Sequence, residues 1–159
     1  MKSISPWSVL MRAHQASMRF DSTVQEWGGA VLGFLLRCFV AWQFLKAGWI
    51  KLSDWGITLD LFREEYQVPL LNPELAAYVG TAGELLFPVL LILGLFSRPA
   101  ALGLFAVNAM AVISYPALWG FECPAAINDH LYWGIILLVL AVFGVGKFSL
   151  DAVLSRRRA

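Results

Sequence analysis

The sequence has 159 residues, of which 59% are hydrophobic and only 14% are charged, and its formal net charge at pH 7 is +1. Soluble globular chains average about 45–50% apolar and about 25% charged residues, so this apolar surplus indicates a single-domain membrane protein rather than a soluble one. The small net charge excludes a strongly basic nucleic-acid-binding protein, and we expect no nucleic-acid partner.

The first 26 residues precede the apolar part of the chain and form a separate N-terminal segment, 1–26. The segment has no continuous apolar run ahead of a small-residue cleavage site, so it is not a signal peptide. Four of its apolar residues share one face of a helix: Trp7, Leu10, Met11 and Met18. Two interpretations stay open, a short helix on the cytoplasmic membrane surface and a mobile tail.

Four apolar stretches are long enough to cross a membrane as helices, because about 20 residues span the hydrocarbon core. They cover residues 27–47, 75–96, 99–119 and 131–148. The short connection at 97–99 predicts a tight antiparallel hairpin between the second and third spans. The predicted fold is therefore an all-α, integral membrane four-helix bundle over residues 27–154, followed by a basic tail at 155–159.

The connection between the first two spans, 52–74, alternates apolar and charged residues and ends in turn signals. It predicts a short amphipathic helix on the outer rim of the bundle. Orientation follows from the twelve Lys and Arg residues, which resist translocation: eight lie on the side of the termini, three on the other side, and Arg37 within a span. Both termini are therefore expected in the cytoplasm.

Three spans each carry one strong polar residue near the middle: Arg37, Glu84 and Asn108. Counted from the cytoplasmic ends at about 1.5 Å per residue, the three residues lie at similar depths. A charge at the bilayer centre costs about 2.5–3.5 kcal/mol, so it requires a partner or a water-filled cavity. We expect an Arg37–Glu84 ion pair with Asn108 completing its hydrogen bonds. This network either fixes the helix register, lines a pocket for a polar-headed lipophilic molecule such as a quinone, or relays protons.

Four further residues are candidates that support this pocket. Phe44 and Lys51 share a helical face with Arg37, while Pro88 and Arg98 follow Glu84 at helical spacing. Lys51 and Arg98 have an alternative role, in which their ammonium and guanidinium groups reach the lipid phosphates. Pro88 predicts a kink near the polar plane.

Metal and cofactor chemistry has little support. Four potential ligands share the second outer loop, Glu122, Cys123, Asp129 and His130, but their spacing matches no compact copper or zinc motif, so no metal site is predicted. His130 is expected at the level of the lipid headgroups. The sequence shows no cofactor motif, and Cys38 and Cys123 form no C-x-x-C pair.

Several runs of the sequence resemble the DoxX family. Residues 37–51 begin with an arginine and continue to an aromatic residue, a glycine and a lysine at the family's spacing. The second span resembles the family through Glu84, the Leu-rich run 90–95 and the Ser97-Arg98 pair. Residues 144–151, Gly-Val-Gly-Lys-Phe-Ser-Leu-Asp, resemble the family's closing segment, although Val145 replaces a frequent proline and Pro88 stands where glycine is frequent.

The resemblance implies a small four-helix protein of the prokaryotic inner membrane. The family is named after subunits associated with an archaeal terminal quinol oxidase and thiosulfate:quinone oxidoreductase, and many relatives accompany oxidative-stress, thiol or metal-stress functions. We therefore expect quinone-linked redox or stress metabolism, a quinone as the candidate ligand, and a protein partner or a homo-oligomer. Two alternatives stay open: a non-catalytic scaffold or accessory subunit whose ion pair is structural, and a small transporter.

Overall fold

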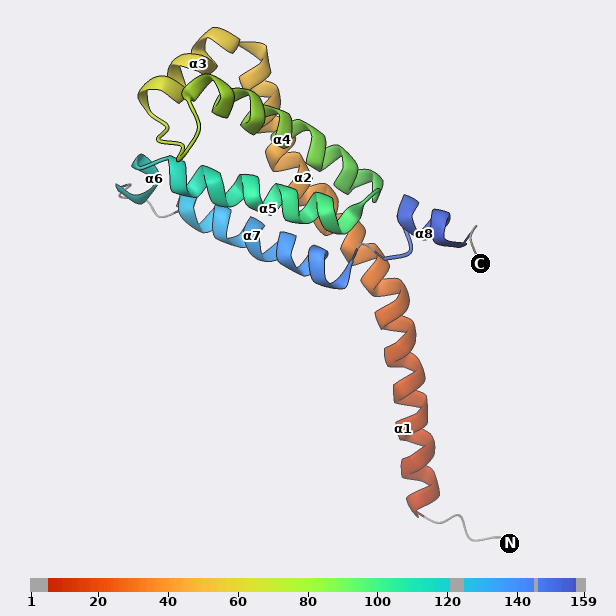
Figure 1. Cartoon of the computed structure of the whole chain (residues 1–159). Coiled ribbons are helices and arrows are strands. Elements are labelled where there is room, and N and C mark those ends of the chain that lie inside the picture. Colours follow the sequence, from red (N-terminus) through yellow and green to blue (C-terminus); the bar gives the residue numbers. More distant parts are fainter. Residues whose placement is uncertain (1–5, 121–124, 145, 157–159) are drawn as a thin grey trace, which may run out of the picture.

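The computed structural model describes residues 6–120, 125–144 and 146–156, which are helical for most of their length and contain no strand. The described elements follow one another as shown in Figure 1: α1 (Pro6–Thr23), the π-helical turn η1 (Val24–Gly28), α2 (Gly29–Ser53), α3 (Trp55–Glu64), α4 (Pro73–Leu93), α5 (Ser97–Ser114), α6 (Ala117–Gly120), α7 (Ala125–Phe143) and α8 (Leu150–Arg156).

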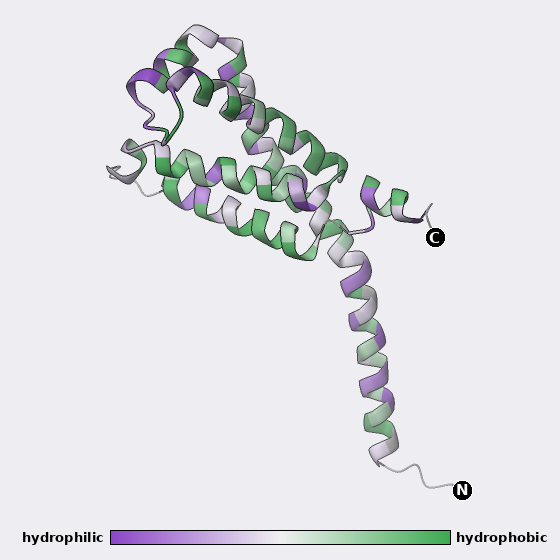
Figure 2. Ribbon diagram, viewed as in Figure 1, coloured by the Kyte–Doolittle hydropathy of each residue, from purple (hydrophilic) through white to green (hydrophobic). Residues whose placement is uncertain are grey.

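Among the described residues, four helices are long and apolar enough to cross a membrane, in agreement with the predicted all-α fold with four spans. In Figure 2, hydrophobic residues dominate α4, α5 and α7, whereas α1 mixes hydrophilic and hydrophobic residues. The helix ends differ from the predicted ones. The first span continues to Ser53, and the fourth begins at Ala125 and stops at Phe143, before Gly144 with its positive φ of 79°.

The N-terminal segment is a helix over its described part, and it runs through η1 into α2 without a break. Helix α1 projects away from the bundle in Figure 1, and its apolar residues Trp7, Leu10 and Met18 are exposed. The two interpretations of residues 1–26, a helix on the membrane surface and a mobile tail, both stay open, although residues 6–23 are helical. Contact of α1 with the membrane surface stays a prediction.

Helix α3 lies in the connection between the first two spans. Side-chain caps at the starts of α3 and α4 determine where these two helices begin. The side chain of Asp54 accepts a hydrogen bond from the Ile57 amide at the start of α3, and Asn72 does the same for Leu75 at the start of α4. Phe62 of α3 is buried against α4, in a small cluster with Ala76 and Ala77. Placement of α3 at the outer rim stays a prediction.

Helices α4 and α5 form the predicted antiparallel hairpin, which turns at Gly94 (Figure 1). Gly94 adopts the left-handed conformation, with φ of 67°, and a side chain there would collide with Ser149 and with the Arg37 guanidinium. The turn is therefore packed tightly against α2 and the segment that leads into α8. Helix α5 begins at Ser97, two residues before the predicted Pro99.

One apolar core joins the four long helices. Its buried members come from α2, α4, α5 and α7: Val40, Phe44, Leu91, Ala100, Ala101, Leu104, Leu137 and Leu140. Close approach of α4 and α5 depends on small residues, since a Cβ at Gly83 would lie 2.8 Å from Cγ2 of Val107. This core does not fill the whole bundle, and a cavity lies between the spans on the side of α3 and α6.

Candidate functional site

Arg37 lies at the end of the bundle where the α4–α5 hairpin turns, and it is fully buried. Its Nη2 donates a hydrogen bond to the carbonyl of Phe148, and its guanidinium lies 5.2 Å from the ring centroid of Phe34. Among the described residues, Nε and Nη1 have no hydrogen-bond partner. Arg37 therefore holds the segment before α8 against the bundle.

Glu84 forms an ion pair with Lys51, not with Arg37. The Lys51 ammonium lies 2.7 Å from both carboxylate oxygens of Glu84, and only 14% and 10% of the two side chains are exposed. Gly48 lets α2 and α4 approach beside this pair, because a Cβ there would lie 2.9 Å from Cγ of Leu85 and 3.1 Å from Cβ of Glu84. The pair thus crosses between two closely packed spans.

Asn108 belongs to a third, separate arrangement, between α5 and α7. Its Nδ2 donates to the carbonyl of His130 at 2.9 Å, and its Oδ1 lies 2.8 Å from Nδ1 of the His130 ring. Asn108 is buried. This double contact fixes the imidazole on the wall of the bundle interior.

The predicted network of Arg37, Glu84 and Asn108 is therefore wrong. The prediction begins the first span at Trp27, but the helix extends from that residue back towards Pro6, and Arg37 meets the turn at Gly94. Glu84 lies ten residues before Gly94 along α4, which is about 15 Å. Because α2 and α4 run antiparallel, the residue of α2 that reaches Glu84 is Lys51, and its ammonium is paired with that carboxylate.

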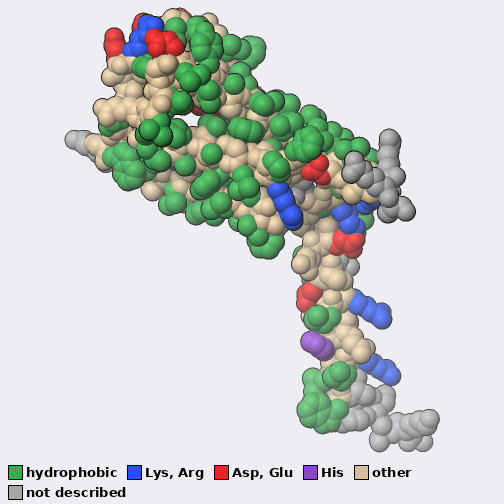
Figure 3. Space-filling view, viewed as in Figure 1, with side chains coloured by type: hydrophobic (Ala, Val, Ile, Leu, Met, Phe, Trp, Pro, Cys, Tyr) green, Lys and Arg blue, Asp and Glu red, His purple; other side chains and the backbone are tan. Residues whose placement is uncertain are grey.

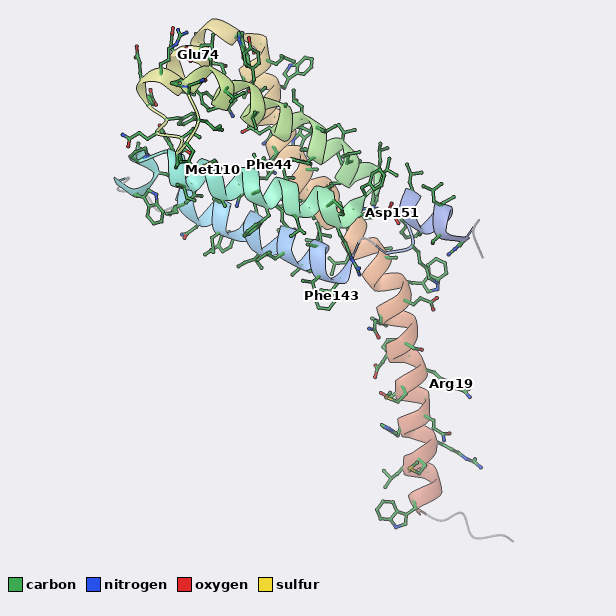
Figure 4. The ribbon with its side chains drawn as sticks, viewed as in Figure 1. Arg19, Phe44, Glu74, Met110, Phe143 and Asp151 are labelled. Carbon is green, nitrogen blue, oxygen red and sulfur yellow. The ribbon has the colours of Figure 1, made fainter. Side chains whose placement is uncertain are left out.

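A cavity of about 560 Å³ lies between the spans on the side of α3 and α6. Figure 3 shows a hollow on this face, between the end that carries α3 and helix α5. Most lining side chains are apolar, among them Phe44 from α2 and Met110 from α5, both labelled in Figure 4. The ion pair and His130 also line it. The cavity thus combines an apolar wall with a few convergent polar groups, as ligand sites do.

Tyr66 and Ser114 add polar groups to the cavity wall. Burial, reinforced by the charge of Glu84 and by Tyr115, raises the pKa of Tyr66 to about 12, so its phenol stays protonated at neutral pH. Ser114 is buried, and its hydroxyl has no hydrogen-bond partner among the described residues. A buried hydroxyl without a partner is uncommon in proteins, and a bound water or ligand that supplies the missing bond is one explanation for it.

The remaining candidates divide between the cavity and other parts of the bundle. Phe44 and Lys51 line the cavity, while Pro88 is buried in α4 and is not among the lining residues. Arg98 is not part of the second span: it is exposed in the first turn of α5, with Nη2 3.5 Å from the carbonyl of Val142. Glu122 and Cys123 of the alternative metal site lie outside the described residues.

Sequence reasoning missed His130, Tyr66 and Ser114. The sequence predicts His130 at the headgroup level, just before a fourth span that begins at 131, whereas α7 begins at Ala125 and His130 lines the cavity. Its depth in the membrane stays a prediction. Tyr66 and Ser114 have no recognisable motif. The only signal for His130 was the need of the buried Asn108 for a partner on a neighbouring span.

Two comparisons with known proteins agree with this architecture. The family model described as DoxX matches residues 32–117. An uncharacterized protein of Haemophilus influenzae is 30% identical over 139 residues, which cover 86% of this chain and 91% of that protein. No solved structure matches the chain. Since the family model covers more than half of the sequence, including Lys51, Glu84 and Asn108, the chain belongs to the DoxX family of membrane proteins.

Proposed function

We propose that this protein binds a lipophilic molecule with a polar head, of the quinone class, in the cavity between its spans. Through that site it acts in quinone-linked redox or in oxidative-stress, thiol or metal-stress metabolism, together with a protein partner or as a homo-oligomer. The observation that carries the proposal is the mainly apolar cavity of about 560 Å³ with the Lys51–Glu84 pair in its wall.

The size and the lining of the cavity support this ligand class. Binding pockets for small molecules usually measure about 300–1,000 Å³ and combine apolar walls with a few polar groups that orient the ligand. Aromatic and aliphatic residues such as Phe44, Phe87 and Met110 would contact the ring and the start of the tail. Lys51 would donate a hydrogen bond to a quinone oxygen, because its ammonium has three protons and Glu84 accepts two.

The chemistry of such a protein depends on what it binds. The sequence shows no cofactor motif, so electrons would be carried by the bound quinone or by a neighbouring subunit. The chain's own residues would bind the head group, hold its oxygen atoms and exclude lipid from around it.

A non-catalytic scaffold or accessory subunit is the second candidate, and one observation favours it. Arg37 shows that this chain uses a buried charge for packing alone, since it joins Phe148 to the bundle far from the cavity. The Lys51–Glu84 pair would have the same role if it only secured α2 against α4. The two candidates differ in what happens to ligand binding when the pair is replaced by neutral residues.

We also propose the prokaryotic inner membrane as the location, with both termini in the cytoplasm and α3 on the opposite rim. The distribution of Lys and Arg supports this orientation, because eight of the twelve lie on the side of the termini. Reporter domains fused to either end, one active only in the cytoplasm and one only outside it, test this. Activity of the external reporter at either terminus would contradict the orientation.

The experiment that tests the binding site uses the full chain in lipid nanodiscs and decylubiquinone as the probe. The double variant Lys51→Met with Glu84→Gln removes both charges at similar volume, a change that buried ion pairs tolerate. The matched control, Arg63→Met with Glu74→Gln, removes the exposed pair between α3 and α4. We expect calorimetry to show at least about tenfold weaker binding in the first variant, as for loss of a charged hydrogen bond, and no change in the control.

Two results would contradict the proposal. Equal affinity of the cavity variant and the wild type would show that the pair does not contact the ligand. Unchanged binding combined with reduced protein abundance would favour the scaffold.

A further inference from the structure

We propose that His130, oriented by Asn108, is the hydrogen-bond acceptor of the cavity and makes the site select the hydroxyl-bearing, reduced form of its ligand, a quinol or phenol, over the oxidised quinone. This inference rests on the proposed function, because it assigns the preferred ligand class of the same cavity. It follows from the contacts of the His130 ring and from one buried hydroxyl, that of Ser114, which lines the same cavity.

The contacts of Asn108 determine which ring nitrogen of His130 carries the proton. The backbone carbonyl of His130 can only accept, so the amide end that faces it at 2.9 Å is the NH₂ group. The other end, Oδ1, therefore faces Nδ1 of the ring at 2.8 Å. Since Oδ1 can only accept, Nδ1 must be the protonated nitrogen, and in the neutral ring Nε2 carries a free lone pair.

The His130 ring is held at the cavity wall with this second nitrogen unused. Its ring packs edge-on against Trp133 at a centroid distance of 4.9 Å, and Trp133 packs in turn against Phe44 at 5.7 Å. All three residues line the cavity. Within the described part of the chain no hydrogen bond to Nε2 is present, so the acceptor is available to a bound molecule.

Ser114 gives a second, independent indication that the ligand forms hydrogen bonds. Only 3% of this residue is exposed, it lines the same cavity, and its hydroxyl has no partner among the described residues. Its backbone carbonyl is already used by the amide of Gln67 at 2.7 Å. A hydroxyl group on the ligand satisfies such a serine as either donor or acceptor.

Nε2 of His130 distinguishes the two redox forms of a quinone by hydrogen bonding alone. A quinol has hydroxyl groups that donate to Nε2, whereas a quinone has carbonyl oxygens that only accept and would face the lone pair of Nε2. A buried acceptor opposite another acceptor leaves both without partners, which is costly. The site therefore binds the quinol more tightly, while Lys51 contacts an oxygen in either form.

The test compares decylubiquinol with decylubiquinone on the full chain in nanodiscs, under anaerobic conditions at pH 8, where a histidine of ordinary pKa is neutral. We expect the wild type to bind the quinol at least about tenfold more tightly. His130→Phe keeps the ring against Trp133 but removes the acceptor, so the preference should disappear while quinone affinity is retained. Asn108→Leu, which releases the ring, should reduce the preference, and the control variant Arg63→Met with Glu74→Gln, outside the cavity, should leave it unchanged.

The outcomes separate this inference from the function on which it rests. Equal affinity for both forms in the wild type, with binding that still depends on Lys51 and Glu84, would overturn the role of His130 and leave the proposed function standing. An unchanged preference in His130→Phe would also overturn it. Absence of binding of either probe to the wild type would overturn both. The ratio of the wild type's affinities for quinol and quinone tests the inference even if a variant does not fold.

Discussion

Asp151 caps helix α5 from a distance of 54 residues along the chain. One carboxylate oxygen accepts hydrogen bonds from the backbone amide and the hydroxyl of Ser97, at 2.9 and 2.6 Å, and the other accepts from the amide of Phe96 at 3.0 Å. The amide of Asp151 donates back to the carbonyl of Gly94. Figure 4 shows Asp151 beside the end of the α4–α5 hairpin. The closing Ser-Leu-Asp segment and the hairpin are therefore one structural unit.

Replacement of this cap should destabilise the bundle. Asp151→Asn removes the charge that faces the N-terminus of α5, and loss of a helix cap typically costs about 1 kcal/mol. For a chain of this size that corresponds to a decrease of about 2–4 °C in Tm. Asp21→Asn, at an exposed position on α1, is the matched control and should leave Tm unchanged. An unaltered Tm in the Asp151 variant would show that the cap contributes nothing.

The contribution of Asp151 should depend on pH in the acid range. Burial raises the pKa of this carboxyl, but the hydrogen bonds from Ser97 and Phe96 together outweigh burial and leave the pKa below its ordinary value of 3.8. A pKa that is lower in the folded state stabilises the fold above pH 3.8, and this stabilisation is lost as the pH falls through the folded-state value. The difference in Tm between wild type and Asp151→Asn should be constant near neutrality and shrink below about pH 4. A difference that grows on acidification would contradict this sign.

The sequence predicts the number of spans and the hairpin well, because both depend on the length of apolar stretches and on turn residues. It also names Glu84, Lys51 and Phe44 as candidates, and all three line the cavity. The pairing of charges was wrong for a geometric reason. Depth within a membrane is counted from the ends of a helix, and the first helix has no end near Trp27, since α1, η1 and α2 are continuous.

Other parts of the site could not be predicted because they depend on tertiary contacts between distant segments. His130 and Ser114 reach the cavity only through the packing of α7 and α5. Asp151 caps a helix that begins 54 residues earlier, and no local pattern around Ser97 indicates a remote cap. The resemblance to the DoxX family identifies the closing Ser-Leu-Asp segment as a family motif, but it does not show which residues Asp151 contacts.

Arg37 should be dispensable for ligand binding, because it lies at the hairpin turn and does not line the cavity. In Arg37→Gln we expect the affinity for decylubiquinone to stay within roughly twofold of the wild type, as for independent sites. The segment 146–156 should exchange its amide hydrogens faster, because Phe148 loses its hydrogen bond to the guanidinium. A large loss of affinity with normal exchange would place Arg37 in the binding site.

Gly48 should be required for the close approach of α2 and α4 beside the ion pair. Gly48→Ala places a methyl group 2.9 Å from Leu85 and 3.1 Å from Cβ of Glu84, and such overpacking costs about 1–3 kcal/mol. We expect a lower Tm and weaker probe binding. Gly29→Ala is the control, because nothing lies within 4 Å of a Cβ there, and alanine in a helix gains up to about 1 kcal/mol over glycine. Equal stability of the two variants would contradict the tight crossing.

Photolabelling tests most directly whether the cavity binds a quinone. An azido derivative of ubiquinone is bound to the full chain in nanodiscs and illuminated, and the modified residues are identified by mass spectrometry, with excess decylubiquinone as competitor. If the quinone binds in the cavity, we expect labels that the competitor reduces at cavity residues such as Phe44, Met110 and Trp133. These labels should be lost in the Lys51→Met, Glu84→Gln variant. Labels that fall instead on exposed residues outside the cavity, such as Leu102 and Val139, and that the competitor does not reduce would contradict it.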